Sequence, residues 1–366
     1  MERLLCIVGS MNAGGAETFL MKLYRKLDRT KYQMDFAVAV KEKGFYDDEI
    51  LDMGGKIFQI TPKSKGIFKN FNSIRCLVKR EGYQSVLRTS QHSLSALELY
   101  AARLGGAKNL IFRSSNTNTT SGRGIDLMLH KLCAFMPMIF ANVRIAPSTE
   151  AADFMFGNGC VSNGKAFLLH NGVDLALYRF DMIDRESVKK EFCIENKLVV
   201  GHVGRFNHQK NHEKLIDVFQ QIVKREPNSV LMLVGQGELE EYIKRKVNES
   251  CIADKVIFTG VRSDVPRLLS GMDVFVFPSL YEGMPNTIIE AQANGLPCVI
   301  SNSITKEAEV TDLINYLSLE EPNELWAETV LELMLKETDR ASYSIRLKEQ
   351  GYGIEECTSQ FIKMVF

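Results

Sequence analysis

Two glutamates lie eight positions apart in a segment of this chain that predicts a turn followed by a helix. The segment, residues 278–301, reads PSLYEGMPNTIIEAQANGLPCVIS and contains Glu282 and Glu290. Its turn is formed by Gly283, Met284 and Pro285, and proline favours the first turn of a helix because the N–H that it lacks would have no intrahelical partner there. We expect the helix over residues 286–294 and a buried strand directly after it.

This order of residues suits the binding of a phosphate-linked sugar. The free N–H groups of the helix start at Asn286, together with the positive end of the helix dipole, attract an anionic diphosphate. Glu290, one turn further on, can accept hydrogen bonds from ribose hydroxyls, and Glu282 can face the other end of the same ligand. The alternative is a helix cap with two solvated glutamates.

Two cations follow another expected strand, over residues 198–203. The segment 204–211, GRFNHQKN, places Arg205 and Lys210 on one strand-to-helix loop. The arginine, through its planar fork, and the lysine, as a point charge, could clamp two phosphates. Both would stabilise a diphosphate leaving group. A pair of surface cations is the alternative.

A glycine-rich turn follows the first expected strand. The segment 9–17, GSMNAGGAE, contains Gly14 and Gly15, which let the backbone approach a ligand where a Cβ would collide. The segment lacks the G-x-G-x-x-G spacing of a dinucleotide fingerprint and the Lys-Ser/Thr of a P-loop, which argues against a dehydrogenase and an ATPase. A purely structural turn is the alternative.

Two weaker signals follow strands in the second half. Gly235 belongs to a Gly-x-Gly pattern at residues 235–237. The segment 258–262, which ends in Val261 and Arg262, could present its backbone to a nucleobase. Either signal alone has little specificity.

Short apolar runs alternate with amphipathic segments along the whole chain, which predicts an α/β fold with doubly wound parallel sheets. The expected strands of the first half span residues 4–8, 34–40, 57–60, 85–87, 110–113 and 143–146, and those of the second half span residues 198–203, 229–234, 256–259, 274–278 and 297–301. The polar stretch 171–192 between the two series reads as the interdomain connection. In open parallel sheets ligands bind outside the carboxyl ends of the strands, so we expect a ligand in a cleft between two such domains.

The composition is that of an ordinary globular protein. The 366 residues exceed what one hydrophobic core usually supports, so two domains are expected. The eight cysteines form no C-x-x-C pair, which favours a reduced, cytosolic compartment. The apolar core of the N-terminus is too short for a signal peptide, and charged and polar residues interrupt the most apolar window, residues 127–146.

Overall neutrality conceals a difference between the two halves. Lys and Arg outnumber Asp and Glu by 23 to 15 over residues 1–175, and are outnumbered by 22 to 30 in the remainder. The basic half could rest on an anionic membrane surface or guide an anionic acceptor. A chance imbalance spread over separate faces is the alternative. A nucleic acid partner is not expected, because no basic stripe with interleaved aromatic residues is present.

Taken together, these segments resemble the GT-B glycosyltransferases, in particular the large retaining family (family 4) that builds bacterial capsule, exopolysaccharide and lipopolysaccharide. The resemblance covers essentially the whole chain, and it is most specific at Glu282 to Glu290, at GRFNHQKN and at the linker signature 171–174, NGVD. It implies two Rossmann-like domains facing a central cleft. We expect an acceptor-side domain over residues 1–172, a nucleotide-sugar-binding domain over residues 173–352, and a C-terminal helix within residues 353–366 that packs back toward the first domain.

The resemblance also implies roles for the residues named above. Arg205 and Lys210 hold the nucleotide diphosphate, Glu290 holds the ribose, and Glu282 faces the donor sugar. Gly14 and Gly15 approach the diphosphate from the other domain. The nucleoside diphosphate sugar, with uridine preferred, is a co-substrate, and no cofactor or metal is expected. The donor-binding set is Gly14, Gly15, Arg205, Lys210, Gly235, Val261, Arg262, Glu282, Gly283, Met284, Pro285, Asn286 and Glu290.

The sequence departs from the family pattern in the first domain. Many relatives carry a histidine near the end of a middle strand that contacts the donor sugar. Here the nearest histidine is His92, displaced from that position, and an ordinary helix-cap or surface histidine is the alternative. Arg113, Ser115 and Asn116 occupy a loop that is often histidine-rich in relatives and are expected to border the acceptor.

The predicted activity is transfer of a glycosyl unit with retention at the anomeric carbon, to a glycan or a lipid-linked oligosaccharide, by a cytoplasmic enzyme that could lie on the inner face of the membrane. The leaving phosphate itself can take the acceptor proton, so charge stabilisation and alignment are the main contributions of the enzyme. Two other classes stay open. One is a sugar-nucleotide epimerase or a phosphorylase of the same architecture, and the other is a non-catalytic partner subunit that binds the nucleotide.

Overall fold

The chain divides into two compact units. The computed structural model describes residues 1–12, 14–115, 124–282, 284–336 and 338–366. Unit 1 comprises Met1–Gly172 together with Ile354–Phe366, and unit 2 comprises Val173–Gly353. Among the described residues, no helix is both long and apolar enough to cross a bilayer.

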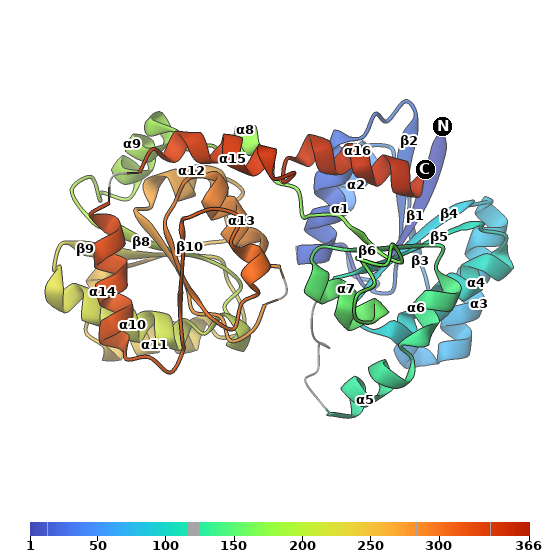
Figure 1. Cartoon of the computed structure of the whole chain (residues 1–366), viewed down its shortest axis with the longest axis horizontal. Helices are drawn as coiled ribbons and strands as arrows, with labels where there is room; N and C mark the ends of the chain where they lie inside the picture. The colour runs from blue at the N-terminus through green and yellow to red at the C-terminus, as the bar shows by residue number, and fades with distance from the viewer. Residues whose placement is uncertain (13, 116–123, 283, 337) are drawn as a thin grey trace. The chain divides into compact units, whose positions relative to one another are not determined.

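Unit 1 is built on a parallel sheet in the order β3-β2-β1-β4-β5-β6-β7 (Figure 1). The strands are β1 (Glu2–Val8), β2 (Tyr32–Val38), β3 (Ile57–Gln59), β4 (Ser85–Ser90), β5 (Asn109–Ser114), β6 (Val143–Ala146) and β7 (Phe167–Leu168). The helices are α1 (Gly15–Lys26), α2 (Asp47–Asp52), α3 (Ile67–Glu81), α4 (Ala96–Gly105), α5 (Gly124–Leu132), α6 (Phe135–Phe140), α7 (Thr149–Phe156) and α16 (Ile354–Val365).

Hydrophobic side chains cover both faces of this sheet, as a parallel sheet with helices on each side requires. Along β1, Leu5 and Ile7 enter one core, whereas Leu4, Cys6 and Val8 enter the other. The second of these cores also receives side chains of α1 and α16, and Figure 1 shows the red C-terminal helix α16 beside the blue α1. Helix α16, from the last part of the sequence, therefore packs into the same core as β1 and α1 from the first part.

Unit 2 repeats the plan with the order β10-β9-β8-β11-β12-β13. Its strands are β8 (Leu198–Val203), β9 (Ser229–Val234), β10 (Val256–Gly260), β11 (Val274–Phe277), β12 (Cys298–Ser301) and β13 (Ile314–Leu317). Its helices are α8 (Leu175–Tyr178), α9 (Met182–Glu191), α10 (His212–Arg225), α11 (Glu240–Glu249), α12 (Val265–Gly271), α13 (Asn286–Ala293), α14 (Asn323–Met334) and α15 (Tyr343–Glu349).

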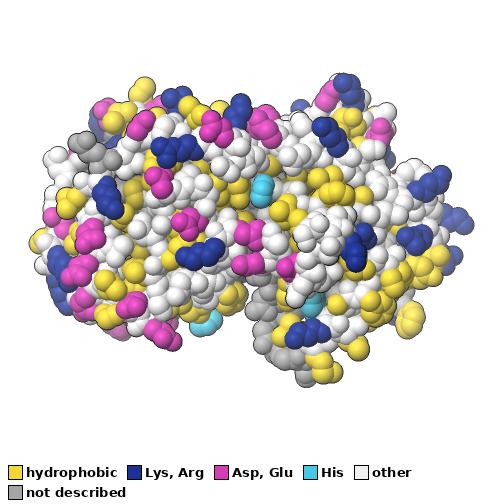
Figure 2. Space-filling model, viewed as in Figure 1, with side chains coloured by type: hydrophobic (Ala, Val, Ile, Leu, Met, Phe, Trp, Pro, Cys, Tyr) yellow, Lys and Arg dark blue, Asp and Glu magenta, His cyan; other side chains and the backbone are white. Residues whose placement is uncertain are grey.

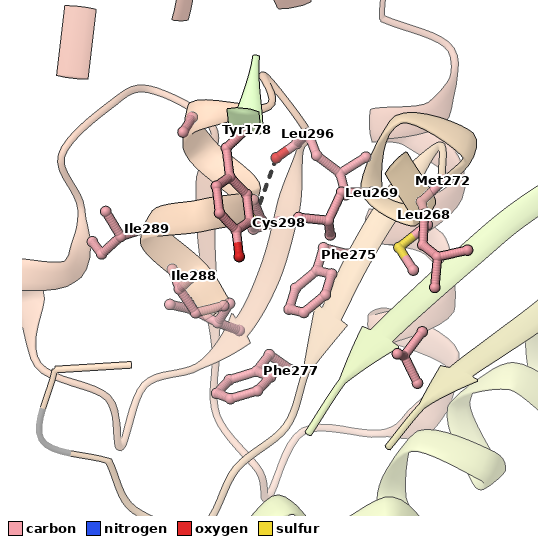
Figure 3. Packing of buried hydrophobic residues seen from close by; sticks show 14 of the residues in the cluster. Tyr178, Leu268, Leu269, Met272, Phe275, Phe277, Ile288, Ile289, Leu296 and Cys298 are labelled. Carbon is pink, nitrogen blue, oxygen red and sulfur yellow. Dashed lines mark hydrogen bonds between the residues drawn. The ribbon is translucent and has the colours of Figure 1, made fainter. Parts of the chain in front are cut away.

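The core of unit 2 fixes the position of α13 against the sheet. Figure 3 shows Ile288 of α13 facing Phe275 and Phe277 of β11, with Ile289 on the same helix. All four side chains are fully buried. Burying one such side chain stabilises the fold by roughly 1.5–3 kcal/mol, so the start of α13 is held firmly at the end of β11.

Every strand predicted from the sequence is present, with differences at the ends, and two strands escaped prediction. β7 has only two residues, and β13 is an edge strand whose residues are largely half-buried, so neither carries a strong hydrophobic pattern. The stretch predicted as the interdomain connection, residues 171–192, is different in the structure. It contains α8 and α9, which begin where Asp174 and Asp181 accept hydrogen bonds from first-turn N–H groups.

Candidate active site

The two segments that carry the strongest sequence signals leave neighbouring strands of the unit 2 sheet. The first, residues 204–211, follows β8, and the second, residues 278–285, follows β11. β8 and β11 are adjacent, and the chain runs from β8 to β9 on one side and from β11 to β12 on the other. This is the topological switch point, outside which open α/β sheets bind their ligands.

Lys210 and Glu282 meet at this switch point. Lys210 Nζ lies 2.6 Å from Glu282 Oε1, and their side chains are only 16% and 10% exposed. The ammonium also lies 4.4 Å from the centroid of the Phe277 ring, which adds a cation–π attraction. The lysine is therefore aimed by two groups of the β11 segment, and its positive charge is placed where an anion could reach it.

Backbone and amide hydrogen bonds join the two segments. The N–H of Leu280 donates to the carbonyl of Gln209 over 2.9 Å. Gln209 Nε2 donates in turn to the carbonyl of Tyr281, also over 2.9 Å. The Lys210–Glu282 pair thus spans two loops that are already bound to each other, which reduces the entropy lost in holding two long side chains together.

Arg205 occupies a different environment from Lys210. Its side chain is 71% exposed and forms an ion pair of 3.2 Å with Glu238, whose side chain is also exposed. An exposed pair of this kind contributes little to stability, so the arginine can exchange its carboxylate partner for a phosphate at small cost.

Gly235 is required by the packing of the Arg205 loop. Its φ is +133°, and a Cβ built on it would overlap the carbonyl oxygen of Gly204. A Cβ on Gly237 would likewise overlap the carbonyl oxygen of Phe206. The weak Gly-x-Gly signal therefore has a structural cause, namely the close approach of the loop after β9 to the loop after β8.

Two buried histidines lie beneath the same loop, and sequence reasoning missed both. His202 on β8 bonds through Nδ1 to the carbonyl of Val276 over 2.9 Å, so Nδ1 carries the proton. Its ring packs against that of His212, the first residue of α10, with centroids 4.7 Å apart. None of the described residues bonds to His202 Nε2 or to either ring nitrogen of His212.

Burial keeps both imidazoles neutral. Loss of hydration, with a smaller effect from the charge of Lys210, lowers the pKa of His212 to about 4. Loss of hydration also lowers the pKa of His202 well below its ordinary value. The sequence offered one signal for the burial of His202, namely its position inside the apolar strand 198–203.

The helix predicted after Pro285 is confirmed as α13, with one correction. Pro285 is the N-cap residue, with φ −76° and ψ 109°, rather than a first-turn residue, so the helix starts at Asn286. Glu290 lies on this helix and is only 6% exposed. Met284 packs against the hydrophobic core, whereas Gly283 lies outside the described residues.

Val261 and Arg262 follow β10 in the same unit. Val261 is exposed. The Arg262 guanidinium makes two hydrogen bonds to the Asp264 carboxylate, of 2.7 and 2.8 Å, and an ion pair of 3.1 Å with Glu191. These bonds lower the pKa of Asp264 strongly. Arg262 is therefore already saturated with carboxylate partners.

In unit 1, the glycine-rich segment also lies at a switch point. It follows β1, which neighbours β4, and the chain leaves these strands in opposite directions. A Cβ on Gly14 would overlap the Glu17 carboxylate, whereas Gly15 has open space around its Cα. Burial raises the pKa of Glu17. A side chain at position 14 would only require the flexible end of Glu17 to move, and Gly15 is the glycine that a ligand could approach.

His92 caps a short helix in unit 1, as the alternative interpretation of the sequence held. Its Nδ1 accepts a hydrogen bond from the N–H of Leu94, and its Nε2 lies 3.2 Å from the carbonyl of Asp126. Because Nδ1 accepts, Nε2 carries the proton and donates. Both ring nitrogens are therefore engaged, and a contact with a sugar would require one of these bonds to break.

The residues predicted to border the acceptor lie at the end of β5. Arg113 is 1% exposed, packs over the ring of Phe19 at 3.8 Å, and donates to Asn171 Oδ1 over 2.6 Å. Burial lowers its pKa to about 9. The structure thus places Arg113 in the core, next to the linker signature. Ser115 is half-buried, and Asn116 lies outside the described residues.

Within the described part of the chain, no three His, Cys, Asp or Glu side chains are grouped so that they could hold a metal ion. The predicted absence of a metal or cofactor stays a prediction.

Comparison with known proteins relates this geometry to a family. A family model described as glycosyl transferases group 1 matches residues 184–350, which include both segments of the switch point in unit 2. EpsF of Bacillus subtilis, named as a glycosyltransferase, is 35% identical over 335 residues, covering 90% of this chain and 87% of the relative. The UDP-Gal:alpha-D-GlcNAc-diphosphoundecaprenol alpha-1,3-galactosyltransferase of Escherichia coli is 29% identical over 282 residues, covering 74% and 72%.

Solved structures share the fold over nearly the whole chain. Alr3699/HepE of Anabaena, solved in complex with UDP-glucose, matches with a TM-score of 0.80 at 19% identity, covering 99% of each chain. WaaG, solved as a glycosyltransferase involved in lipopolysaccharide biosynthesis, matches with a TM-score of 0.74 at 13% identity, covering 99% of each chain. At this level of identity the likeness shows the fold, which is GT-B.

Proposed function

This chain belongs to the group 1 glycosyl transferases, and from that premise we propose that it moves a sugar from a nucleoside diphosphate sugar to a glycan or lipid-linked oligosaccharide. The proposed setting is the biosynthesis of a surface polysaccharide such as a capsule. Relatives named for capsular polysaccharide biosynthesis and for transfer onto a diphosphoundecaprenol-linked sugar support this setting.

The observation that carries the proposal is the Lys210–Glu282 pair at the switch point of unit 2. A cation and a carboxylate, both largely buried, are held 2.6 Å apart between the loops after β8 and β11. α13 begins directly after the second loop and adds the positive end of its dipole. A diphosphate joined to a sugar needs both kinds of group, a cation for the phosphates and a carboxylate for the hydroxyls.

We assign the donor-binding roles accordingly. Lys210 and the more exposed fork of Arg205 bind the diphosphate, the first turn of α13 from Asn286 onward adds N–H groups, and Glu290 accepts from the ribose. Glu282 accepts from hydroxyls of the donor sugar. These groups stabilise the charge that grows on the diphosphate as the bond between the anomeric carbon and the phosphate oxygen breaks.

The proposed reaction proceeds with retention and without a metal ion. The acceptor hydroxyl attacks the anomeric carbon from the face that the diphosphate leaves, and its proton passes to a departing phosphate oxygen. One C–O bond forms as another breaks, so no separate base is needed. Uridine is the proposed base, supported by the solved neighbours that contain UDP.

We place the acceptor on the side of unit 1 and the enzyme in the cytoplasm, in contact with an anionic membrane surface. The excess of Lys and Arg over residues 1–175 supports this placement, since it would attract both an anionic lipid-linked acceptor and acidic lipids. A cleft between the two units, as the resemblance implies, stays a prediction.

The proposal is tested by measuring products. Thermal stabilisation by a panel of UDP- and GDP-linked sugars identifies the donor, because a ligand that binds the native state raises the unfolding temperature. The selected donor is then incubated with lipid-linked oligosaccharides, and the anomeric configuration of the product is determined by NMR. A glycoside of retained configuration supports the proposal. Interconversion of the donor without a second sugar indicates an epimerase, and nucleotide binding without turnover on any acceptor indicates a partner subunit.

A further inference from the structure

A stripe of exposed hydrophobic side chains runs along α5 and α6 in unit 1. Two members lie four residues apart on α5 and two lie four residues apart on α6, so that each pair shares one face of its own helix. They are Met128, Leu132, Phe135 and Ile139, with exposed fractions of 69%, 69%, 55% and 57%. A surface helix normally turns polar side chains to water, so these exposed apolar side chains depart from the usual pattern.

The stripe is not the inner face of these helices. Cys133 and Pro137 are buried on the other side, and Met136, Met138 and Phe140 pack against the hydrophobic core of unit 1. α6 is thus apolar on both sides, one toward the core and one toward solvent. A helix that is apolar on all sides belongs in an apolar environment on all sides.

The start of α3 extends the same surface. Phe68 is 90% exposed, and its neighbour Ile67 is 47% exposed. A row of aromatic rings connects this end of α3 with α6, because Tyr100 packs against Phe71 at 5.9 Å on one side and stacks on Phe140 at 4.9 Å on the other. We call the stripe of α5 and α6, together with Ile67 and Phe68, the α3–α6 surface.

Positive side chains surround the α3–α6 surface. Lys65, Lys69 and Lys131 are exposed, and no ion pair joins them to another described residue. Arg75 and Lys79 are exposed as well and follow Phe68 at steps of seven and eleven residues, on the same face of α3. Figure 2 shows hydrophobic side chains together with Lys and Arg over the part of unit 1 that contains α3, α5 and α6.

We propose that the α3–α6 surface docks on a lipid bilayer that contains anionic lipids. Its apolar side chains would enter the boundary between headgroups and acyl chains, while the surrounding lysines would lie against acidic headgroups. Charge favours lipid over a second copy of this chain, because the same lysines would face each other across a symmetric contact. The inference rests on the proposed function, since it supplies the means to reach a lipid-linked acceptor.

The test is co-sedimentation of the full chain with vesicles. Vesicles of phosphatidylcholine with about one third phosphatidylglycerol are compared with vesicles of phosphatidylcholine alone. The chain is expected to bind the anionic vesicles. The double variant Phe68→Ser with Phe135→Ser should lower the partition coefficient roughly tenfold or more, because two large apolar side chains no longer enter the bilayer. The double variant Lys69→Glu with Lys131→Glu should lower it about as much, and added salt should reproduce that loss.

Ile183→Ser is the matched control, since Ile183 is 77% exposed but belongs to α9 of unit 2. It should bind vesicles like the unaltered chain. Thermal stabilisation by the donor should be the same in all variants, which separates a failure of this inference from a failure of the proposed function. Equal vesicle binding by all variants would overturn the inference. So would concentration-dependent dimerisation that the serine variants abolish in the absence of vesicles, because it would identify a second copy as the occupant.

Discussion

At the residue scale, the Lys210–Glu282 pair is where a diphosphate would have its largest effect. The lysine is bonded to a carboxylate and lies over the Phe277 ring, so its position is fixed before any ligand arrives. A phosphate that takes the ammonium frees the carboxylate for sugar hydroxyls. Breaking the bond between Lys210 and Glu282 would therefore free the ammonium for the phosphates and the carboxylate for the sugar at the same time.

Replacing either cation should lower turnover without unfolding the protein. We expect Lys210→Ala and Arg205→Ala each to reduce kcat roughly a hundredfold or more, by analogy with the loss of a donor that stabilises charge in the transition state. Lys244→Ala is the control, because Lys244 lies on α11, outside the loops after β8 and β11, and pairs there with Glu240 and Glu241. Steady-state kinetics with saturating donor measure the effect. Wild-type turnover in both site variants would exclude the assigned roles.

The buried imidazoles should make the protein less stable in mild acid. The unfolded chain protonates His212 near its ordinary pKa of 6.5, whereas the folded chain resists protonation until a pH of about 4. Between these two pH values the unfolded state thus binds more protons than the folded state. The free energy of unfolding is therefore highest above pH 6.5 and decreases as the pH is lowered toward 4. The loss by pH 4 is on the order of 3 kcal/mol for His212.

Urea denaturation at a series of pH values measures this dependence. His212→Phe keeps a ring of similar size and should flatten the fall in unfolding free energy between neutral pH and pH 5. His208→Phe is the control, because His208 is exposed in the same loop and should leave the slope unchanged. An identical slope in the His212→Phe variant would show that this imidazole is not kept neutral by burial.

At the element scale, the loops after β8 and β9 are packed so closely that glycine is obligatory between them. We expect Gly235→Ala to lower the unfolding free energy by about 2–4 kcal/mol, because the new Cβ overlaps the Gly204 carbonyl as well as straining a positive φ. Gly351→Ala isolates the second effect, since Gly351 has a φ of +80° but open space around it, and should cost only about 1–2 kcal/mol.

Thermal or chemical denaturation of the two variants provides the comparison. The Gly235→Ala variant should also bind the nucleotide more weakly, because the displaced backbone of Gly204 carries Arg205. Equal stability of the two variants would mean that the loops can move apart without cost.

The sequence predicts elements best where one physical pattern dominates. β8 and β9 were placed correctly to the residue, because their runs are apolar on both faces, and α13 followed from a turn, a proline and a glycine stop. The short β7 and the edge strand β13 carry no such pattern. α8 and α9 were overlooked in a polar stretch because their helical starts depend on single capping aspartates.

The candidate site was predictable in its residue types but not in its contacts. Glu282, Lys210 and Arg205 were identified from segment order and spacing. Lys210 bonds Glu282, whereas Arg205 pairs with Glu238. These partners depend on which strands are neighbours in the sheet, and no single segment of the sequence predicts the strand order. The bond from Arg113 to Asn171 and the contact of His92 Nε2 with the carbonyl of Asp126 likewise involve residues far along the chain, whereas the capping bond of His92 to Leu94 is local.

At the scale of the whole molecule, the last helix of the chain belongs to the first unit. α16 buries Phe361 and Val365 in the core that also contains the side chains of α1. We expect Phe361→Ala to destabilise unit 1 by about 3–5 kcal/mol, the cost of removing a buried aromatic ring. Hydrogen exchange measured by mass spectrometry should therefore accelerate in β1 and β2.

Unit 2 provides the internal control for that experiment. Its strands β8 and β11 share no core with Phe361, so their exchange should stay as slow as in the unaltered chain. Equal acceleration in both units would show that they unfold as one cooperative body.

A crystal structure of the protein soaked with UDP would decide whether unit 2 binds a diphosphate at its switch point. We expect density for the two phosphates beside Arg205, Lys210 and the first turn of α13, with the ribose near Glu290 and the carboxylate of Glu282 released from the lysine. Ordered UDP bound anywhere else, with the Lys210–Glu282 pair intact, would contradict this expectation.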